Sequence, residues 1–416
     1  MAVIRPFRAL RPTKDKVAQV AALPYDVVTT EEAKKLVKDN NYSFLHVDKP
    51  EIDFDEPVDP YDVRVYKKAG EKLSQMVKEG VYKRDKNPCI YIYQLTRDEK
   101  IQQGIVACTS IDDYVNNVIK KHENTLQAKE QDRINHVKYT KAHTGPIMMF
   151  YRENQQISNE IKSWILNNEP VYNFVSVDNV KQTIWIVNDE ATIKKLTEMF
   201  SKVNSLYIAD GHHRAAAAVK VGLEMRQSNP NHTGDEEYNY FLSVIFPDKQ
   251  LTIMEYNRVI KDLNGFSEKE LLEKIEGNFE LVYKGKDPFK PRAKHFFGMY
   301  INGKWYGLRV RENSFDENDP VGSLDVSILQ NLVVSPIFGI TNPREDNRID
   351  FVGGVKGIDE LARLVDSRKA SVAFSLYPTP IDDLIKIADM GLIMPPKSTW
   401  FEPKLQSGIF IHSLED

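Results

Sequence analysis

Short apolar runs and amphipathic helical patterns alternate through the middle of the chain. The runs are rich in β-branched and aromatic residues, and they predict strands at 147–151, 183–187 and 205–209. Segments with apolar residues at helical spacing follow them, and these predict helices at 157–166, 191–200 and 215–226. Because strands and helices take turns along the sequence, the pattern predicts a mixed α/β or α+β core.

Turn residues between other apolar runs predict three hairpins. Their strands are 90–95 with 104–110, 240–246 with 251–256, and 296–301 with 304–310. The third turns at Asn302-Gly303, which favours a type I′ turn. A turn-rich break at 229–237 and the length of 416 residues predict two domains. We expect an N-terminal α/β domain at 1–228 and a C-terminal α+β domain at 229–416.

Composition narrows the class of protein. The formal net charge is −4, from 56 basic and 60 acidic residues, so the basic excess of an obligate nucleic-acid binder is missing. A small anionic ligand is still compatible, because it needs only a few cations and backbone N–H groups. Cys89 and Cys108 lie in apolar runs, and no signal peptide or run of about 18 apolar residues is present. We expect a cytoplasmic protein with no nucleic-acid or membrane partner.

The strongest candidate for chemistry is the loop Asp210-Gly211-His212-His213-Arg214, which joins a predicted strand to an alanine-rich helix. Gly211 would let the backbone approach a ligand, and the helix start offers N–H groups and a positive dipole end. Arg214 adds a bidentate cation, the two histidines add donors that titrate near neutrality, and Asp210 is a ligand for Mg²⁺ or a group that orients a histidine. The alternative is an ordinary helix start with surface histidines and an aspartate cap.

A second candidate site consists of Glu123 and residues of the helix that is predicted to follow it at 125–143. Four polar residues share one face of that helix: Asp132, His136, Thr140 and His143. For Thr140 and His143 we favour a solvated face. For Glu123, Asp132 and Arg133 we favour a functional site, because a carboxylate near a bound phosphate serves as a general base or a metal ligand.

Two proline-bearing segments complete the set of candidates. Asp26 follows Pro24-Tyr25 and is either a binding residue or the start of an Asx turn. The second segment contains Lys397, Ser398 and Thr399, which follow the prolines 395–396, and Lys404, which follows the proline 403. These cations and hydroxyls suit a phosphate or carboxylate, although the segment has no Walker pattern, and the alternative is a surface loop.

The motifs also carry a resemblance. The central loop with its alanines resembles the phosphate-binding box of the ParB/sulfiredoxin superfamily, and most closely that of the free serine kinases. Four segments in order resemble the domain-of-unknown-function family numbered 1015 over its full length: 22–27, 122–125 with Asp132-Arg133, 210–214 and 394–404. The first departs from the family's usual double proline at Leu23. The occurrence of that family beside serine biosynthesis points to serine or phosphoserine as the substrate.

The resemblance and the residues together predict an α+β (mixed α/β) fold with a ParB/sulfiredoxin-like catalytic unit in a larger two-part protein. We expect phosphoryl transfer by a free serine kinase using ATP or ADP with Mg²⁺. The alternatives are a phosphoserine phosphatase at the same site and a ParB-like nucleotide-gated binding or regulatory protein without turnover. The expected roles are catalysis by Asp210, Glu123 and His213; phosphate or nucleotide binding by Gly211, His212, Arg214 and Arg133; substrate binding by Asp26, Lys397, Ser398, Thr399 and Lys404; and metal binding by Asp210 and Asp132.

Overall fold

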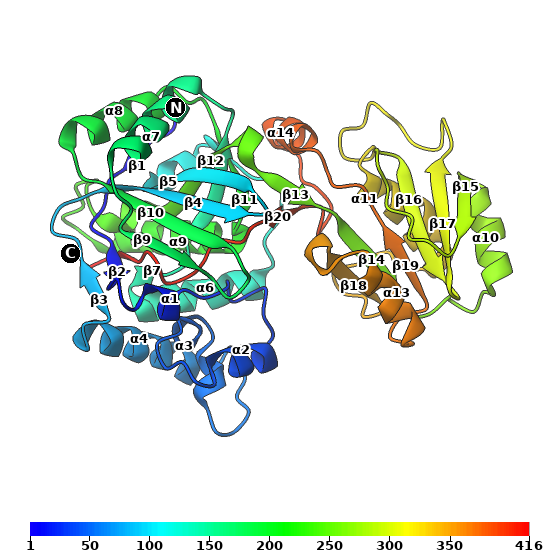
Figure 1. Ribbon diagram of the computed structural model, residues 1–416, viewed down its shortest axis with the longest axis horizontal. Helices are drawn as coiled ribbons and strands as arrows, with labels where there is room; N and C mark the ends of the chain where they lie inside the picture. The colour runs from blue at the N-terminus through cyan, green and yellow to red at the C-terminus, as the bar shows by residue number, and fades with distance from the viewer. Residues whose placement is uncertain (416) are drawn as a thin grey trace. The chain divides into compact units, whose positions relative to one another are not determined.

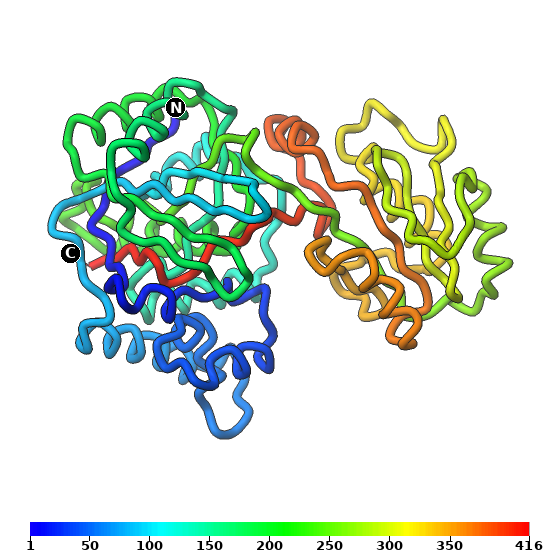
Figure 2. The backbone as a smooth tube through the Cα atoms, viewed as in Figure 1, coloured from blue at the N-terminus to red at the C-terminus, as the bar shows by residue number. Residues whose placement is uncertain are grey.

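The computed structural model describes residues 1–415, which form two compact units (Figure 1). The first unit comprises Met1–Leu251 and the chain from Pro403 onward, and the second is Thr252–Glu402. The predicted boundary after residue 228 differs from this division. Strand β12 (Tyr240–Pro247) lies inside the sheet of the first unit, and the red C-terminal segment in Figure 2 runs back into that unit.

The first unit is built on a nine-stranded mixed sheet. Its order is β6 (Ile119–Lys120), β11 (Leu206–Asp210), β8 (Ile147–Tyr151), β12, β5 (Lys100–Ser110), β4 (Ile90–Arg97), β10 (Lys181–Val187) and β9 (Tyr172–Val175), with β1 (Ile4–Arg5) paired to β5. Only β11 with β6 and β12 with β8 run parallel among these pairs. The alternation of helices and strands therefore forms a mixed α/β sheet, and the predicted fold class is confirmed.

Helices α7 (Gln155–Asn167), α8 (Glu190–Phe200) and α9 (His212–Ser228) pack on this sheet. Strand β8 shows the period of two that the packing requires, since Ile147, Met149 and Tyr151 face that core. The other side of α9 packs against α6 (Gln127–Thr140). Strand β11 lies second from the edge of the sheet, next to β6, and the predicted loop lies between β11 and the start of α9.

A helical layer covers α6 in turn. It contains α4 (Val63–Lys78), α3 (Leu45–Asp48) and α2 (Thr30–Val37), which begins with a capping box at Thr29. Gly70 allows α4 to approach closely, because a Cβ there would lie 2.5 Å from the carbonyl oxygen of Tyr139. Short elements β2 (Leu10–Pro12), β3 (Tyr82–Arg84), α1 (Val17–Val20), α5 (Ile111–Val115), β7 (Ala142–His143) and β21 (His412–Ser413) complete the unit.

The second unit is a six-stranded antiparallel sheet with helices. Its strand order is β15 (Phe279–Gly285), β17 (Lys304–Val310), β16 (Phe296–Ile301), β19 (Val372–Ser375), β14 (Tyr256–Ile260) and β18 (Ile349–Gly353). Its helices are α10 (Glu268–Glu276), α11 (Asp325–Leu329), α12 (Ser335–Phe338), α13 (Asp359–Asp366) and α14 (Ile381–Asp389). Strand β13 (Thr252–Met254) pairs with β20 (Trp400–Glu402), so the two ends of this unit lie side by side.

The hairpin predictions have different outcomes. The predicted hairpins β4–β5 and β16–β17 are confirmed, and the latter turns at Asn302 and Gly303 with φ values of 47° and 72°. The hairpin predicted for 240–246 with 251–256 is wrong, since β12 pairs with β5 and β8, and β13 with β20. Nowhere in residues 1–415 is a helix long and apolar enough to cross a bilayer.

Candidate active site

The central loop lies where β11 ends and α9 begins. Gly211 is the N-cap of α9 and has φ 99°, which an L side chain rarely adopts. A Cβ at this position would also lie 3.0 Å from Nη2 of Arg214, whose guanidinium lies across the glycine. No side chain caps the helix. The strand–glycine–helix unit is therefore formed as the sequence predicts, with its N-terminal N–H groups and positive dipole end at the loop.

Asp210 is held by two cations. Lys404 Nζ lies 3.0 Å from Oδ1, and Arg214 Nη2 lies 2.8 Å from Oδ2. Burial alone would raise the pKa of this carboxyl, but Lys404 and Arg214 hold it well below its usual range. Arg214 also donates to the carbonyl oxygen of Pro146. The guanidinium of Arg214 thus bonds to groups of the protein itself. Lys404, which is nearly 200 residues away in sequence, contacts the same loop.

This arrangement does not fit the predicted magnesium site. A Mg²⁺ ion at Asp210 would have to displace two ammonium or guanidinium partners, and Asp132 is likewise occupied by Tyr66 and Arg133. Within residues 1–415, no group of three or more His, Cys, Asp or Glu side chains is placed to hold a metal ion. A strongly ionised carboxylate with both oxygens bonded is also a weak proton acceptor, which argues against Asp210 as the general base.

The histidines of the loop differ from each other. His212 and His122 are buried and meet edge to face, with ring centroids 4.5 Å apart. Burial lowers the pKa of His122 to about 4 and that of His212 well below its usual value, so both rings are neutral at pH 7. The expectation that His212 titrates near neutrality is therefore wrong. Glu123 Oε2 lies 3.9 Å from Nδ1 of His212, which brings that predicted carboxylate to the loop.

His213 connects two helices. Its Nε2 accepts a hydrogen bond of 3.0 Å from the N–H of Leu126, the N-cap residue of α6. The start of α6 is therefore fixed against the start of α9, and the two helix N-termini lie close together. In this bond Nε2 of His213 carries no proton.

The polar face of α6 is buried rather than solvated. Asp132 accepts from the Tyr66 hydroxyl at 2.9 Å and from Nε of Arg133 at 2.9 Å. The guanidinium of Arg133 lies over the ring of Tyr25, 3.8 Å from its centroid. His136 Nε2 bonds the carbonyl oxygen of Val47 at 2.9 Å. The solvated face expected for Thr140 and His143 is wrong, because the layer of α3 and α4 covers α6, and α6 ends at Thr140 before His143.

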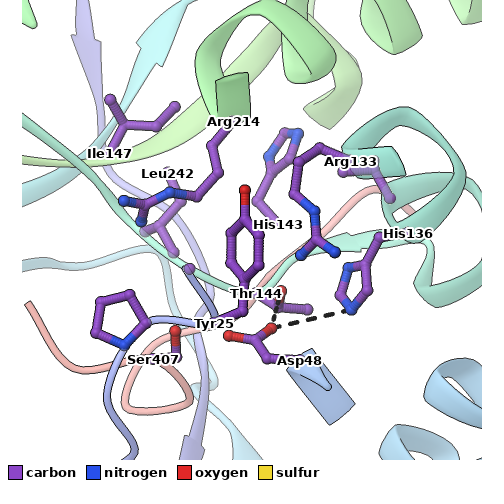
Figure 3. A pocket seen from close by; sticks show the side chains of 13 residues that line it. Tyr25, Asp48, Arg133, His136, His143, Thr144, Ile147, Arg214, Leu242 and Ser407 are labelled. Carbon is purple, nitrogen blue, oxygen red and sulfur yellow. Dashed lines mark hydrogen bonds and ion pairs between the residues drawn. The ribbon is translucent and has the colours of Figure 1, made fainter. Parts of the chain in front are cut away.

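Beside the loop lies a pocket that brings these groups together (Figure 3). Among the side chains that line it are Tyr25, Asp48, Arg133, His143, Arg214 and Ser407. Asp48 accepts a hydrogen bond of 3.1 Å from Thr144, drawn as a dashed line in Figure 3. Two guanidinium groups and one carboxylate thus share a buried cavity whose remaining polar groups are neutral. The charges of this cavity are complementary to those of a zwitterion, whose carboxylate would meet an arginine and whose ammonium would meet the aspartate.

The other predicted residues lie outside this pocket. Asp26 is exposed next to Tyr25. Lys397, Ser398 and Thr399 belong to the second unit, where Ser398 is buried and donates its hydroxyl to the carbonyl oxygen of Pro395 at 2.6 Å. Lys397 has φ 57° and its ammonium lies over the ring of Tyr256. Their role in substrate binding stays a prediction.

Several lining residues were missed by sequence reasoning. Asp48 and Ser407 are not among the candidate residues of the sequence, and His143 was expected on a solvated face. Tyr25 is the neighbour of Asp26, the residue that the sequence predicts to bind substrate. Only the aromatic residue between a proline and an aspartate offered a signal, since an exposed turn rarely needs a tyrosine.

Comparisons with known proteins give a family and distant structural likenesses. The family model described as "Protein of unknown function (DUF1015)" matches residues 4–327. A free serine kinase in complex with AMP is 12% identical at a TM-score of 0.37, over 74% of this chain and 91% of that one. A conserved hypothetical protein from Pyrococcus furiosus is 15% identical at 0.37, over 75% and 96%. SbnI with C-terminal truncation from Staphylococcus aureus is 8% identical at 0.37, over 75% and 89%. No curated protein matches the chain. These values assign no activity.

Proposed function

The chain belongs to the DUF1015 family, a family of unknown function, and we propose that it transfers a phosphoryl group to or from a small hydroxy amino acid. Serine is the expected acceptor, and ATP or ADP the expected donor. The nucleotide follows from the resemblance of the central loop to the phosphate-binding box of free serine kinases. The observation that carries the proposal is the pocket of opposite charges beside the glycine-opened start of α9.

The pocket supplies groups for both ends of an amino acid. Arg133 is 8% exposed and Asp48 4% exposed, so both charges are shielded from bulk water. They also interact, since the carboxylate of Asp48 helps to raise the pKa of Arg133, against the lowering by burial. A bound zwitterion would place its carboxylate at the guanidinium and its ammonium at the carboxylate of Asp48, which leaves the buried charges balanced.

The loop supplies groups for the phosphate. Backbone N–H groups at the start of α9 and the helix dipole favour an anion, and the guanidinium of Arg214 lies over Gly211 at the same place. Arg214 lines the pocket and also contacts Asp210, so the pocket and the loop share this residue. The donor phosphate at the loop and the hydroxyl in the pocket would then be neighbours. Phosphoryl transfer depends mainly on such positioning and on charge stabilisation.

The experiment is a mass-spectrometric turnover assay. Purified protein is incubated with ATP or ADP and a pool of amino acids, with and without Mg²⁺, and separately with phosphoserine alone. We expect phosphoserine from serine. Phosphate released from phosphoserine without nucleotide would instead identify a phosphatase. Nucleotide binding with no product would identify a regulatory protein, and neither binding nor turnover would refute the proposal.

The variant Asp48→Asn tests the pocket. Asparagine keeps the oxygen that accepts from Thr144 but removes the charge that the substrate ammonium needs. We expect KM for the amino acid to rise at least about 10-fold, since charged hydrogen bonds contribute roughly 1.5–3 kcal/mol. The matched control is Asp53→Asn, because Asp53 pairs with His46 and does not line the pocket. Equal KM values in both variants would remove Asp48 from the site.

A further inference from the structure

Three titratable side chains form a hydrogen-bonded row that ends at the pocket. Glu237 Oε2 lies 2.7 Å from Nε2 of His412, and Nδ1 of His412 lies 3.1 Å from Nδ1 of His143. The two histidines are cross-strand partners, since β21 and β7 pair with His412 opposite His143. Glu237 begins the short 3-10 helix Glu237–Asn239 that follows α9. All three residues belong to the first unit.

Hydrogen-bond chemistry orders the protons along this row. A carboxylate only accepts, so Nε2 of His412 carries the proton of the first bond. While His412 is neutral, its Nδ1 is an acceptor, and the proton of the second bond must come from Nδ1 of His143. Nε2 of His143 then holds a free electron pair. The state of each ring is thus determined by Glu237, which Arg5 neighbours at 3.6 Å.

The end of the row is buried and lines the pocket. His143 is 6% exposed, and its Nε2 has no hydrogen-bond partner among residues 1–415. An unsatisfied buried acceptor destabilises the fold, and a ligand that donates a hydrogen bond to it would remove this penalty. Burial and the neighbouring His412 lower the pKa of His143 well below its usual value, which keeps the ring neutral.

We propose that Nε2 of His143 accepts the hydroxyl proton of the bound substrate and that His412 and Glu237 carry this proton away from the pocket. This inference rests on the proposed function. In the transfer step the hydroxyl oxygen forms a bond to the γ-phosphorus of ATP, the bond from that phosphorus to the β-bridging oxygen breaks, and ADP leaves. The hydroxyl proton moves to His143 Nε2, the Nδ1 proton moves to His412, and the His412 Nε2 proton moves to Glu237.

The row lets His143 accept a proton without leaving a charged ring in the pocket, which a single buried histidine could not do. A lone imidazolium in the pocket would be costly because burial penalises its charge. With the relay, the proton ends on a carboxylate and both rings are neutral again. The side chain of Glu237 is 16% exposed, so it can exchange its proton with solvent. Glu123, the carboxylate predicted as base, lies instead at His212 on the loop.

The first test needs no activity. Nitrogen-15 NMR of histidine-labelled full-length protein reports which ring nitrogens carry protons, and the variants His143→Gln and His412→Gln assign the signals. We expect His412 protonated at Nε2 only and His143 at Nδ1 only. Glu237→Gln should reverse both, because Arg5 favours the amide oxygen and leaves the amide N–H₂ for His412. A doubly protonated His412, or a His143 protonated at Nε2 in the wild type, would overturn the inference.

The second test uses turnover. Glu237→Gln should lower kcat at least about 100-fold with little change in KM, as expected for loss of general-base catalysis. Glu236→Gln is the matched control, because Glu236 holds the turn at Thr233 and Gly234 and is outside the row. Unchanged kcat in an active enzyme would overturn the relay and leave the proposed function intact. Absence of turnover in the wild type would overturn the proposed function, while the NMR result still tests the row.

Discussion

Asp325 is buried at the start of α11, and its burial should make the stability of the second unit depend on pH. It is 7% exposed, its Oδ1 accepts from the N–H of His295 at 2.9 Å, and its Oδ2 has no hydrogen-bond partner in the described part of the chain. Burial raises the pKa of this carboxyl from 3.8 to about 7. Because the folded pKa exceeds the unfolded one, its stabilising contribution is complete below pH 3.8 and is lost as the pH rises through 7.

Replacement of Asp325 by asparagine should therefore stabilise the unit at alkaline pH. The amide keeps the oxygen that accepts from His295 and removes the buried charge. A pKa difference of about 3 at 1.36 kcal/mol per unit gives a gain of up to about 4 kcal/mol at pH 8. At pH 5 the wild type has lost stability over only about one pH unit above the unfolded pKa. The gain in the free energy of unfolding should therefore shrink to less than about 2 kcal/mol.

Urea unfolding at pH 5 and pH 8 measures this gain in the free energy of unfolding. The fluorescence of Trp305, which is buried in the same unit, reports the transition. Asp319→Asn is the control, because hydrogen bonds from Gly322 and Val321 lower the pKa of Asp319. A gain for Asp325→Asn that is equal at both pH values would refute the reasoning, since only a titrating group makes the gain depend on pH.

Three further predictions concern the site. Gly211→Ala should lower the free energy of unfolding by roughly 1–2 kcal/mol in urea titrations, because φ 99° is strained for alanine and its Cβ meets Arg214. Lys404→Met should cost roughly 1.5–3 kcal/mol in the same assay, since it removes a charged hydrogen bond from the partly buried carboxylate of Asp210; a loss below about 1 kcal/mol would contradict the ion pair. The melting temperature should fall between pH 6.5 and pH 4 because burial lowers the pKa of His122 to about 4, so the unfolded chain binds that proton first; His122→Gln should flatten this fall.

Local chemistry made the loop predictable, whereas the rest of the site depends on distant segments. Gly211 before an alanine run after an apolar strand specifies strand, turn and helix within a few residues. Nothing local specifies that Lys404 reaches Asp210, or that Ser407 lines the same pocket as Asp48. A partner more than 100 residues away leaves no mark in the periodicity of either segment.

The errors have the same cause. The polar face of α6 has the spacing of a solvated face, and only the layer of α3 and α4 makes it interior. Similarly, residues 252–254 form a strand as expected, but β13 pairs with β20 instead of β12. The periodicity of a strand does not determine which other strand lies beside it. The boundary after residue 228 failed because a turn-rich break was equated with a domain end, although β12 returns to the first sheet.

The return of the chain from Pro403 to the first unit has a consequence for biosynthesis. Lys404, Ser407 and His412 leave the ribosome only after the whole of Thr252–Glu402 has been made. Until then Leu10 lacks the backbone hydrogen bonds that it makes with Ile411, and Asp210 lacks its lysine. A nascent chain, or one that ends before residue 403, would carry Asp210 with Arg214 but without Lys404. The order of synthesis thus places the contact between Lys404 and Asp210 after the synthesis of the second unit.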